Sequence, residues 1–287
     1  MATRSEYRVK DFDPVHIFEC GQCFRWESAG GDVYEGIAGS RPARVTYEPS
    51  EGDRYAGTLI VEDYSSNAES RDFWYDYFDL GRDYGEIKRT LAARDEVMAR
   101  AIKSGEGIRI LNQDRWEALI SFIISQNNNI PRIKKNIRDL TTLFGEPAGK
   151  VGDTEYNAFP EPEVLAALSP DDLAPVKLGY RARYLVETGK QIAENGIDYM
   201  EEHLSDLCGV GPKVANCVAL FSMGRYDAFP VDTWVKQVME REYGLTGKKA
   251  IEEFAAETFG GYGGFAQQYL FYYIRTQSAC GQSHLVK

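Results

Sequence analysis

One lysine of this sequence stands where an amine could act as a nucleophile. Lys213 follows Gly209-Val210-Gly211-Pro212 and precedes a mostly apolar segment, 214–221. The two glycines permit a sharp turn and proline suits the first position of a helix, so the pattern predicts a helix, a tight turn and a second helix. Partial burial and the positive end of the helix dipole both favour the neutral amine, which can attack an electrophilic carbon and form a Schiff base.

The same segment allows another interpretation, in which Lys213 stays protonated and binds phosphate. Free N–H groups at the start of a helix form a phosphate site, so the turn is also typical of a helix–hairpin–helix that holds a DNA backbone. Spacing excludes a P-loop, because Gly209 and Gly211 do not give the pattern Gly-x4-Gly-Lys. The segment alone leaves both roles of the lysine open.

A carboxylate follows in the segment Phe229-Pro230-Val231-Asp232-Thr233-Trp234. Asp232 stands after a proline-stiffened turn, at the expected start of another helix, where aspartate caps well. Capping and chemistry are compatible, since a carboxylate held there can orient the lysine, stabilise a positively charged sugar and relay a proton. The two motifs together are more specific than either one.

The elements that must position these residues fall into two parts. Short runs that alternate apolar and polar residues, at 33–38, 43–47 and 58–62, predict a small antiparallel sheet. From about Arg71 onward the pattern is helical, with helices expected from Pro131 to Gly145, from Ser169-Pro170, and from Pro212 to Gly224.

We therefore expect a mainly α protein with an N-terminal antiparallel β-sheet domain, an α+β arrangement. Residues 1–95 would form the sheet domain with flanking helices. Residues 96–287 would form the helical domain, in which residues of about 200–224 make the helix–hairpin–helix. The segment 86–103 could belong to either part.

Charge argues against a general affinity for nucleic acid, because the formal net charge is -11 and phosphate binding depends on Lys and Arg. The basic residues are nevertheless clustered, which is compatible with a basic face on an acidic body and equally with solvated helix faces. The two clusters are Arg132, Lys134, Lys135 and Arg138, and Lys177, Arg181, Arg183 and Lys190.

Composition also indicates where the protein acts. Five cysteines are sparse for this length and suggest reduced thiols. No apolar run is long enough to cross a bilayer, and the polar first residues lack the apolar stretch of a signal peptide. We expect an intracellular protein with no membrane association, in the cytoplasm or nucleoid if the source is prokaryotic.

Six separated motifs resemble the helix–hairpin–helix DNA glycosylases with a Gly/Pro-rich loop and an essential aspartate, and among them the 8-oxoguanine DNA glycosylase/AP lyases. The resemblance runs roughly from Phe12 to Thr276. Besides the segments around Lys213 and Asp232, the matching segments are Gly21-Gln22-Cys23-Phe24-Arg25-Trp26, Asn127-Asn128-Asn129-Ile130, Gly179-Tyr180-Arg181-Ala182-Arg183-Tyr184 and Phe265-Ala266-Gln267-Gln268-Tyr269-Leu270-Phe271. It implies a sheet domain packed on a two-part helical domain, with double-stranded DNA in the cleft.

The resemblance also implies a reaction. Lys213 would attack C1′ and expel the base, Asp232 would assist, and the Schiff base would permit β-elimination. The carbonyl of Gly21 would read the N7–H that oxidation at C8 creates. Cys217 and Phe271 would sandwich the extruded base, while Gln267 would bond to its Watson–Crick edge.

The DNA contacts implied by the resemblance come from other segments. Asn127 would fill the gap left by the flipped base, Tyr180 would wedge the duplex, and Arg132 and Arg181 would hold the opposite cytosine, whose O2 and N3 are acceptors. Gly209 and Gly211 would face the phosphate backbone. We expect a monomer that needs no cofactor or metal.

Simpler roles remain open for several of these residues. Cys217 is one helical turn beyond Lys213, yet buried cysteine is commonly a small apolar filler. Phe271 suits core packing, Gln267 a solvated helix face, and the two arginines simple phosphate contacts.

The sequence departs from the family in two places. Trp234 stands where the best-known eukaryotic members have histidine, and Cys23 where serine is frequent. The four-cysteine iron–sulfur motif of some relatives is absent, since only Cys280 follows Cys217. A zinc site from His16, Cys20 and Cys23 with the distant Cys280 and His284 is disfavoured, because it overlaps the base-reading segment and has no second cysteine pair.

Two rival functions stay open. One is a glycosylase of the same fold that removes alkylated purines or oxidised pyrimidines, although a simple alkyl-base enzyme would need only Asp232. The other is a non-catalytic helix–hairpin–helix module, in which Lys213 contacts phosphate.

Overall fold

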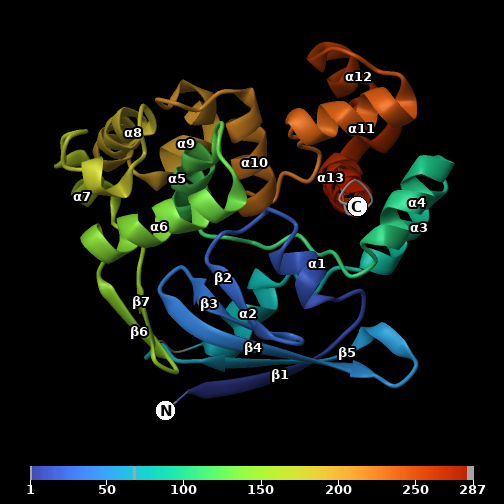
Figure 1. Ribbon diagram of the computed structural model, residues 1–287, viewed down its shortest axis with the longest axis horizontal. Coiled ribbons are helices and arrows are strands. Elements are labelled where there is room, and N and C mark those ends of the chain that lie inside the picture. Colours follow the sequence, from blue (N-terminus) through green and yellow to red (C-terminus); the bar gives the residue numbers. More distant parts are fainter. Residues whose placement is uncertain (1, 67–68, 283–287) are drawn as a thin grey trace.

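The protein is described by a computed structural model that covers residues 2–66 and 69–282, with side chains described through residue 278. An antiparallel sheet of five strands forms its N-terminal part, in the order β1-β5-β4-β3-β2. The strands are β1 (Thr3–Val9), β2 (Trp26–Gly30), β3 (Val33–Ala38), β4 (Arg41–Ser50) and β5 (Asp53–Asp63). Figure 1 shows the sheet on one side of the molecule, with most helices on the other.

Alternation along the strands explains why the sheet has a buried face. In β1, for example, Tyr7 and Val9 are buried and the residue between them is exposed. Helix α2 (Ser70–Tyr77) is attached by Asp63 at the end of β5, whose Oδ2 accepts from Ser70 Oγ at 2.8 Å and from Trp74 Nε1 at 3.0 Å. These bonds satisfy a carboxylate that is 1 % exposed.

The remaining helices form two groups around a long C-terminal helix. Figure 1 shows α5–α10 as one group and α11–α13 as another, with α3 and α4 beside α13. The first group is α5 (Arg115–Ser125), α6 (Ile130–Phe144), α7 (Pro162–Ala166), α8 (Arg181–Asn195), α9 (Met200–His203) and α10 (Pro212–Ser222). The second is α11 (Thr233–Tyr243), α12 (Lys248–Phe259) and α13 (Gly263–Gln282), joined by α3 (Tyr84–Ala92) and α4 (Glu96–Ser104).

The predicted fold class is confirmed, and two expected helices begin and end where proline and glycine placed them. Helix α6 has Pro131 in its first turn and Gly145 as its C-cap. Helix α10 begins at Pro212 and ends at Ser222, two residues before Gly224. The segment 84–104 is divided into α3 and α4, whose apolar residues join the core of the helical part. The domain boundary near residue 95 stays a prediction.

Two expectations about the helical part are wrong. Residues after Phe144 form a hairpin, β6 (Pro147–Val151) and β7 (Thr154–Asn157), where a continuous helical pattern was expected. The physical reason is the turn Gly152-Asp153, in which Gly152 has φ +56°, a conformation suited to two-residue hairpins.

The second wrong expectation is the helix from Ser169-Pro170. The structure has turns there and a single 3₁₀ turn, Ala174–Val176. Asp172 Oδ2 accepts from the N–H of Ser169 at 2.8 Å and so stabilises a local turn. Pro175 has no N–H to extend an α-helix.

Among the described residues, no helix is long and apolar enough to span a membrane.

Candidate active site

A cavity of about 670 Å³ opens between the two helical groups. Its walls come from the loop after α1 (Pro14–Phe18), the loop between α5 and α6, one face of α10, the segment before α11, and α13. The predicted site residues that line it are Gly21, Asn127, Lys213, Cys217, Asp232, Gln267 and Phe271. Residues far apart in sequence therefore meet in one space.

Lys213 reaches this cavity from the first turn of α10, after the N-cap Gly211. Its Nζ lies 3.4 Å from Ser125 Oγ and 5.3 Å from the centre of the Phe122 ring. No carboxylate of the described residues lies within 4.0 Å of this amine. The amine therefore lies beside an aromatic face and a hydroxyl and has no carboxylate partner among the described residues.

Asp232 caps α11 and faces the same cavity. Its Oδ1 accepts from the N–H of Val235 at 2.8 Å, which fixes the carboxyl at the start of the helix. Burial raises the pKa of Asp232 above its ordinary value, against the lowering effects of the Val235 N–H and the charge of Lys213. A carboxyl held in this way is suited to stabilising positive charge and exchanging protons.

Gly21 and Phe271 lie in contact at one end of the cavity. Gly21 has φ +79°, and a methyl group added to it would lie 3.3 Å from Phe271 Cε1. Cys217 also lines the cavity; it is 4 % exposed and one turn beyond Lys213. Burial raises the pKa of the Cys217 thiol, so the thiol is uncharged.

The loop that carries Gly21 is fixed by buried amides. Gln22 is fully buried, and its Nε2 donates to the carbonyl oxygens of Ile17 at 2.9 Å and Arg109 at 2.8 Å. Gln268 Nε2 donates to the carbonyl of Cys20 at 3.0 Å. The backbone at Gly21 is therefore held against α13 by partners on both sides.

Gln267 presents an unused acceptor to the cavity. It is 4 % exposed, and among the described residues its Oε1 has no hydrogen-bond partner. A buried carbonyl without a donor costs about 1–3 kcal/mol, so proteins keep such groups mainly where something else satisfies them. A ligand with an N–H donor would satisfy this atom.

The predicted helix–hairpin–helix is present directly before Lys213. Helix α9, a 3₁₀ turn (Leu204–Asp206) and the turn 207–211 lead into α10. Gly209 has φ +78°, and a methyl group there would lie 2.6 Å from the Tyr184 ring, so only glycine fits. A methyl group added to Gly211 would meet no atom within 4 Å among the described residues, and Gly211 is exposed.

The loop between α5 and α6 carries the residue predicted to fill the duplex. Asn127 has φ +46°, and its Nδ2 donates to Tyr180 OH at 3.3 Å. Tyr180 is 49 % exposed. These two side chains form a polar and aromatic projection beside the cavity.

The two arginines predicted to read the opposite base differ in their surroundings. Arg181 is buried, and its guanidinium donates to the carbonyls of Gln126, Asn127 and Leu178. It therefore supports the Asn127 loop and would have to exchange bonds to meet a base. Arg132 is exposed in the first turn of α6. Neither arginine lines the cavity.

Part of the predicted basic face is neutralised. Lys134 pairs with Glu27 at 3.2 Å, Lys135 with Asp139 at 2.5 Å, and Lys190 with Glu187 at 3.0 Å. These three ion pairs leave the two basic clusters with less net positive charge than the sequence alone suggested.

Two family profiles together match nearly the whole chain. The profile described as 8-oxoguanine DNA glycosylase, N-terminal domain, matches residues 6–119, and the HhH-GPD superfamily base excision DNA repair protein profile matches residues 120–259. A probable N-glycosylase/DNA lyase of Methanothermobacter thermautotrophicus is 30 % identical over 262 residues, which are 79 % of this chain and 82 % of that protein. The chain belongs to the 8-oxoguanine DNA glycosylase family.

Solved structures agree with this family. The 8-oxoguanine glycosylase/lyase of Clostridium acetobutylicum, in complex with double-stranded DNA containing cytosine opposite 8-oxoguanine, is 39 % identical, with a TM-score of 0.86 over 97 % of this chain and 98 % of that one. MBOgg1, in complex with a low-affinity DNA ligand, is 43 % identical, with a TM-score of 0.88 over 97 % of both chains.

Trp234, the departure from the eukaryotic 8-oxoguanine glycosylase pattern, lines the cavity and is half-buried. Its backbone N–H helps lower the pKa of Asp232, which burial raises. Among the described residues, no group of three or more His, Cys, Asp or Glu could hold a metal ion. Cys280 and His284, considered for zinc, lie outside the described side chains.

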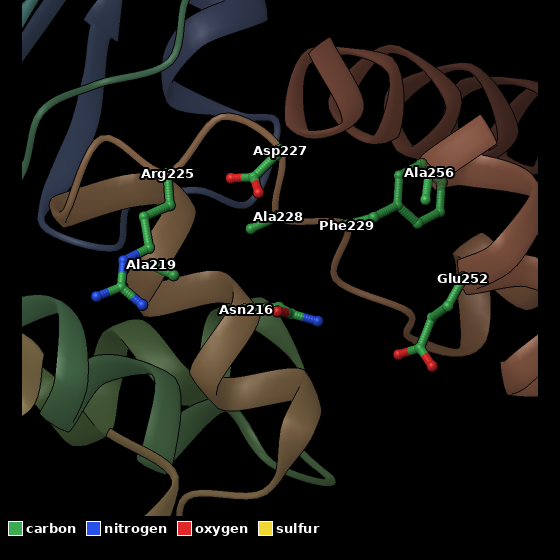
Figure 2. A pocket seen from close by; sticks show the side chains of 8 residues that line it. All are labelled: Asn216, Ala219, Arg225, Asp227, Ala228, Phe229, Glu252 and Ala256. Carbon is green, nitrogen blue, oxygen red and sulfur yellow. The ribbon is translucent and has the colours of Figure 1, made fainter. Parts of the chain in front are cut away.

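A smaller cavity of about 340 Å³ lies on a different face of α10 from Lys213 and Cys217. Figure 2 shows its lining, with Arg225, Asp227 and Glu252 around it and the Phe229 ring directed toward Ala256. None of the predicted site residues lines this space. The predicted catalytic and base-binding residues are therefore gathered in the larger cavity.

Sequence reasoning missed several residues of the larger cavity, and three of them bear on the chemistry. Phe122 and Ser125 come from an apolar helix and gave no signal of contact with Lys213. Arg275 also lines the cavity. Its spacing offered a signal, because it is one turn beyond Phe271 and two turns beyond Gln267 on the same helix.

Proposed function

We propose that this chain excises 8-oxoguanine paired with cytosine from duplex DNA and then cuts the strand by β-elimination, with Lys213 as nucleophile. One observation carries the assignment: Lys213 and Asp232 share a cavity with the unsatisfied Oε1 of Gln267 and the Gly21–Phe271 contact. A nucleophile, a carboxylate and a place for a planar, hydrogen-bonding base are what glycosidic cleavage requires.

The first step replaces one bond at C1′ with another. The neutral Nζ of Lys213 bonds to C1′ as the C1′–N9 bond breaks, and the electron pair of that bond leaves with the base. The carboxylate of Asp232 stabilises the positive charge on the sugar and accepts a proton from the lysine nitrogen. The C1′–O4′ bond then breaks as the lysine nitrogen forms a double bond to C1′, and O4′ takes the proton held by Asp232, which gives the Schiff base. Loss of a proton from C2′ then breaks the C3′–O bond, which releases the 3′ phosphate with its electron pair.

Base selection rests on the far end of the cavity. Oxidation at C8 places a hydrogen on N7, and the carbonyl of Gly21 accepts from it, whereas N7 of guanine has only a lone pair. The base lies between Phe271 and Cys217. Its N1–H or amino group donates to Gln267 Oε1, which has no donor among the described residues.

The duplex is held outside the cavity. The N–H groups at Gly209 and Gly211 face a phosphate at the start of α10. Asn127 occupies the gap left by the extruded base and Tyr180 wedges the stack. Arg132 contacts the opposite cytosine, and Arg181 joins it by exchanging a loop carbonyl for the base. The enzyme acts as a monomer without a cofactor, inside the cell where DNA is found.

Borohydride trapping tests the proposal. Wild type, Lys213→Gln and the exposed-lysine control Lys190→Gln are incubated with a duplex that has one 8-oxoguanine opposite cytosine, and with an undamaged duplex. We expect a reduced covalent adduct from wild type and Lys190→Gln with the lesion only. An adduct from Lys213→Gln would reject this lysine as the nucleophile.

Two other outcomes distinguish the rival functions. Binding to the duplex without base release or adduct would favour the non-catalytic module, in which removing Lys213 weakens binding to all sequences and reduces the salt dependence. Release of alkylated purines or oxidised pyrimidines in preference to 8-oxoguanine would favour a glycosylase of other specificity. Equal cleavage opposite adenine would reject the preference for cytosine.

A further inference from the structure

Arg275 is a charged side chain in the cavity to which the proposed reaction assigns no role. It lies on α13, one turn beyond Phe271, and its guanidinium carbon is 5.3 Å from the centre of the Phe271 ring. A methyl group added to Gly21 would lie 3.5 Å from Arg275 Nη1. The guanidinium therefore lies at the Gly21 end of the cavity, beside the wall on which the base would stack.

The hydrogen bonds of Arg275 leave most of its donors unused. Nη1 donates to the carbonyl of Glu19 at a long 3.4 Å. Within the described part of the chain, no carboxylate lies within 4.0 Å of the guanidinium. An arginine at a cavity wall that has no acid partner keeps its N–H donors available to an anionic or carbonyl ligand.

The positive charge of Arg275 extends across the cavity. It lowers the pKa of Asp232, which burial raises, and acts in the same direction on the thiol of Cys20. Arginine side chains in proteins are charged, whereas an amine must be neutral to act as a nucleophile. Arg275 is therefore a permanent cation in the space that the departing base would occupy.

We infer that Arg275 donates to O8 of the bound 8-oxoguanine and stabilises the negative charge that the base acquires as it leaves. The inference rests on the proposed function. O8 is bonded to C8, which is the ring atom next to N7. A base whose N7–H donates to the Gly21 carbonyl therefore directs O8 toward the group beside that carbonyl. A methyl group built on Gly21 would have two Phe271 ring atoms and Arg275 Nη1 as its three nearest atoms, so the polar one among them is the Arg275 guanidinium.

The chemistry of the leaving group gives this contact a role in rate as well as selection. When the C1′–N9 bond breaks, its electron pair stays on N9 and is shared with the neighbouring C8=O8 carbonyl, so negative charge grows on O8. A guanidinium already in place binds this charge more tightly than it binds the neutral base, which lowers the barrier. Guanine has C8–H at this position and offers no acceptor.

Separate assays of base release and strand cleavage test the role of Arg275. Single-turnover release of 8-oxoguanine is compared with β-elimination on a duplex with a preformed abasic site, from which the base is already absent. The variants are Arg275→Leu, Arg275→Lys and the control Arg241→Leu. The guanidinium carbon of Arg241, on α11, lies 5.6 Å from the centre of the Tyr273 ring on α13, the helix that carries Arg275, but Arg241 does not line the cavity.

We expect Arg275→Leu to release the base about 100-fold more slowly, as removal of one preorganised donor does elsewhere. Cleavage of the abasic duplex and affinity for it should match wild type, which also shows that the variant is folded. Arg275→Lys should recover part of the lost rate because it keeps the charge. Arg241→Leu should match wild type in both assays.

Two results would overturn the inference. Equal losses in both assays, with a smaller salt dependence of binding, would make Arg275 a phosphate contact. Unchanged base release in Arg275→Leu would leave the guanidinium without a role in the reaction. Failure of wild type itself to release 8-oxoguanine would instead count against the proposed function, so the two failures are distinguishable.

Discussion

Lys213 and Asp232 face one cavity from the first turns of two different helices, and the charge of the lysine lowers the pKa of the carboxyl that burial raises. Lys213 is in the first turn of α10, and Asp232 is the N-cap of α11. The two helix starts fix both groups by backbone geometry, so neither depends on a mobile loop for its position. The pair therefore predicts separable effects on chemistry and on stability.

Asp232→Asn should slow base release about 100-fold or more while leaving the fold intact. The amide oxygen can still accept from the Val235 N–H, but it cannot ionise or take a proton. Because Lys213 is retained, trapping on a preformed abasic site should persist. The matched control is Asp114→Asn, since Asp114 caps α5 in the same way outside the cavity. Full base release by Asp232→Asn would remove the carboxylate from the mechanism.

The stability of the protein should also depend on Asp232 in a definite direction with pH. Burial raises its folded-state pKa, so ionising it costs stability, and this loss grows as the pH rises through the folded pKa. Asp232→Asn avoids the loss. Thermal melting should therefore find the variant more stable than wild type at neutral pH, with the difference closing in acid below the ordinary aspartate range. A larger difference in acid than at neutrality would contradict the sign.

The sequence predicted helix starts where residue types have a strong positional preference in helices. Pro212 after Gly211, and Asp232 after Pro230, predict two helix starts from residue type alone, and the structure has both. The division into an antiparallel sheet and helices followed from a change in periodicity. Fold class was therefore accessible from local pattern.

The environment of the lysine was not accessible in this way. Ser125 and Phe122 contact Lys213 from a helix almost ninety positions earlier, and their own segment reads as ordinary core. The buried state of Arg181 likewise depends on carbonyls of another loop. Such contacts arise from packing between distant segments, which periodicity does not encode.

The unused acceptor of Gln267 predicts opposite effects on stability and binding. Gln267→Leu removes a buried oxygen with no partner among the described residues, so the free energy of unfolding should stay level or rise by about 1 kcal/mol. Affinity for the 8-oxoguanine duplex should fall about tenfold, as expected when a base donor loses its acceptor. The control Gln268→Leu should lose stability, because Gln268 Nε2 donates to the Cys20 carbonyl. A stability loss in Gln267→Leu that equals that of the control would show that Gln267 is structural.

The two hairpin glycines predict a contrast between folding and DNA binding. Gly209→Ala should destabilise the protein by at least about 2 kcal/mol, because alanine at φ +78° is strained and its methyl group would lie 2.6 Å from the Tyr184 ring. The backbone of residue 211 has a negative φ, and a methyl group there would meet no neighbour among the described residues. The free energy of unfolding of Gly211→Ala should therefore stay within about 1 kcal/mol of wild type.

Binding should nevertheless suffer in Gly211→Ala, because a methyl group at the helix start would obstruct a phosphate approaching the free N–H groups. Thermal melting and a DNA titration on each variant separate the two effects. We expect a melting loss for Gly209→Ala, and for Gly211→Ala a normal melt with affinity lowered about equally for damaged and undamaged duplexes. A methyl group at residue 211 would meet no neighbour among the described residues, so it should not disturb the fold. Unimpaired DNA binding by Gly211→Ala would therefore show that the phosphate binds elsewhere on the surface.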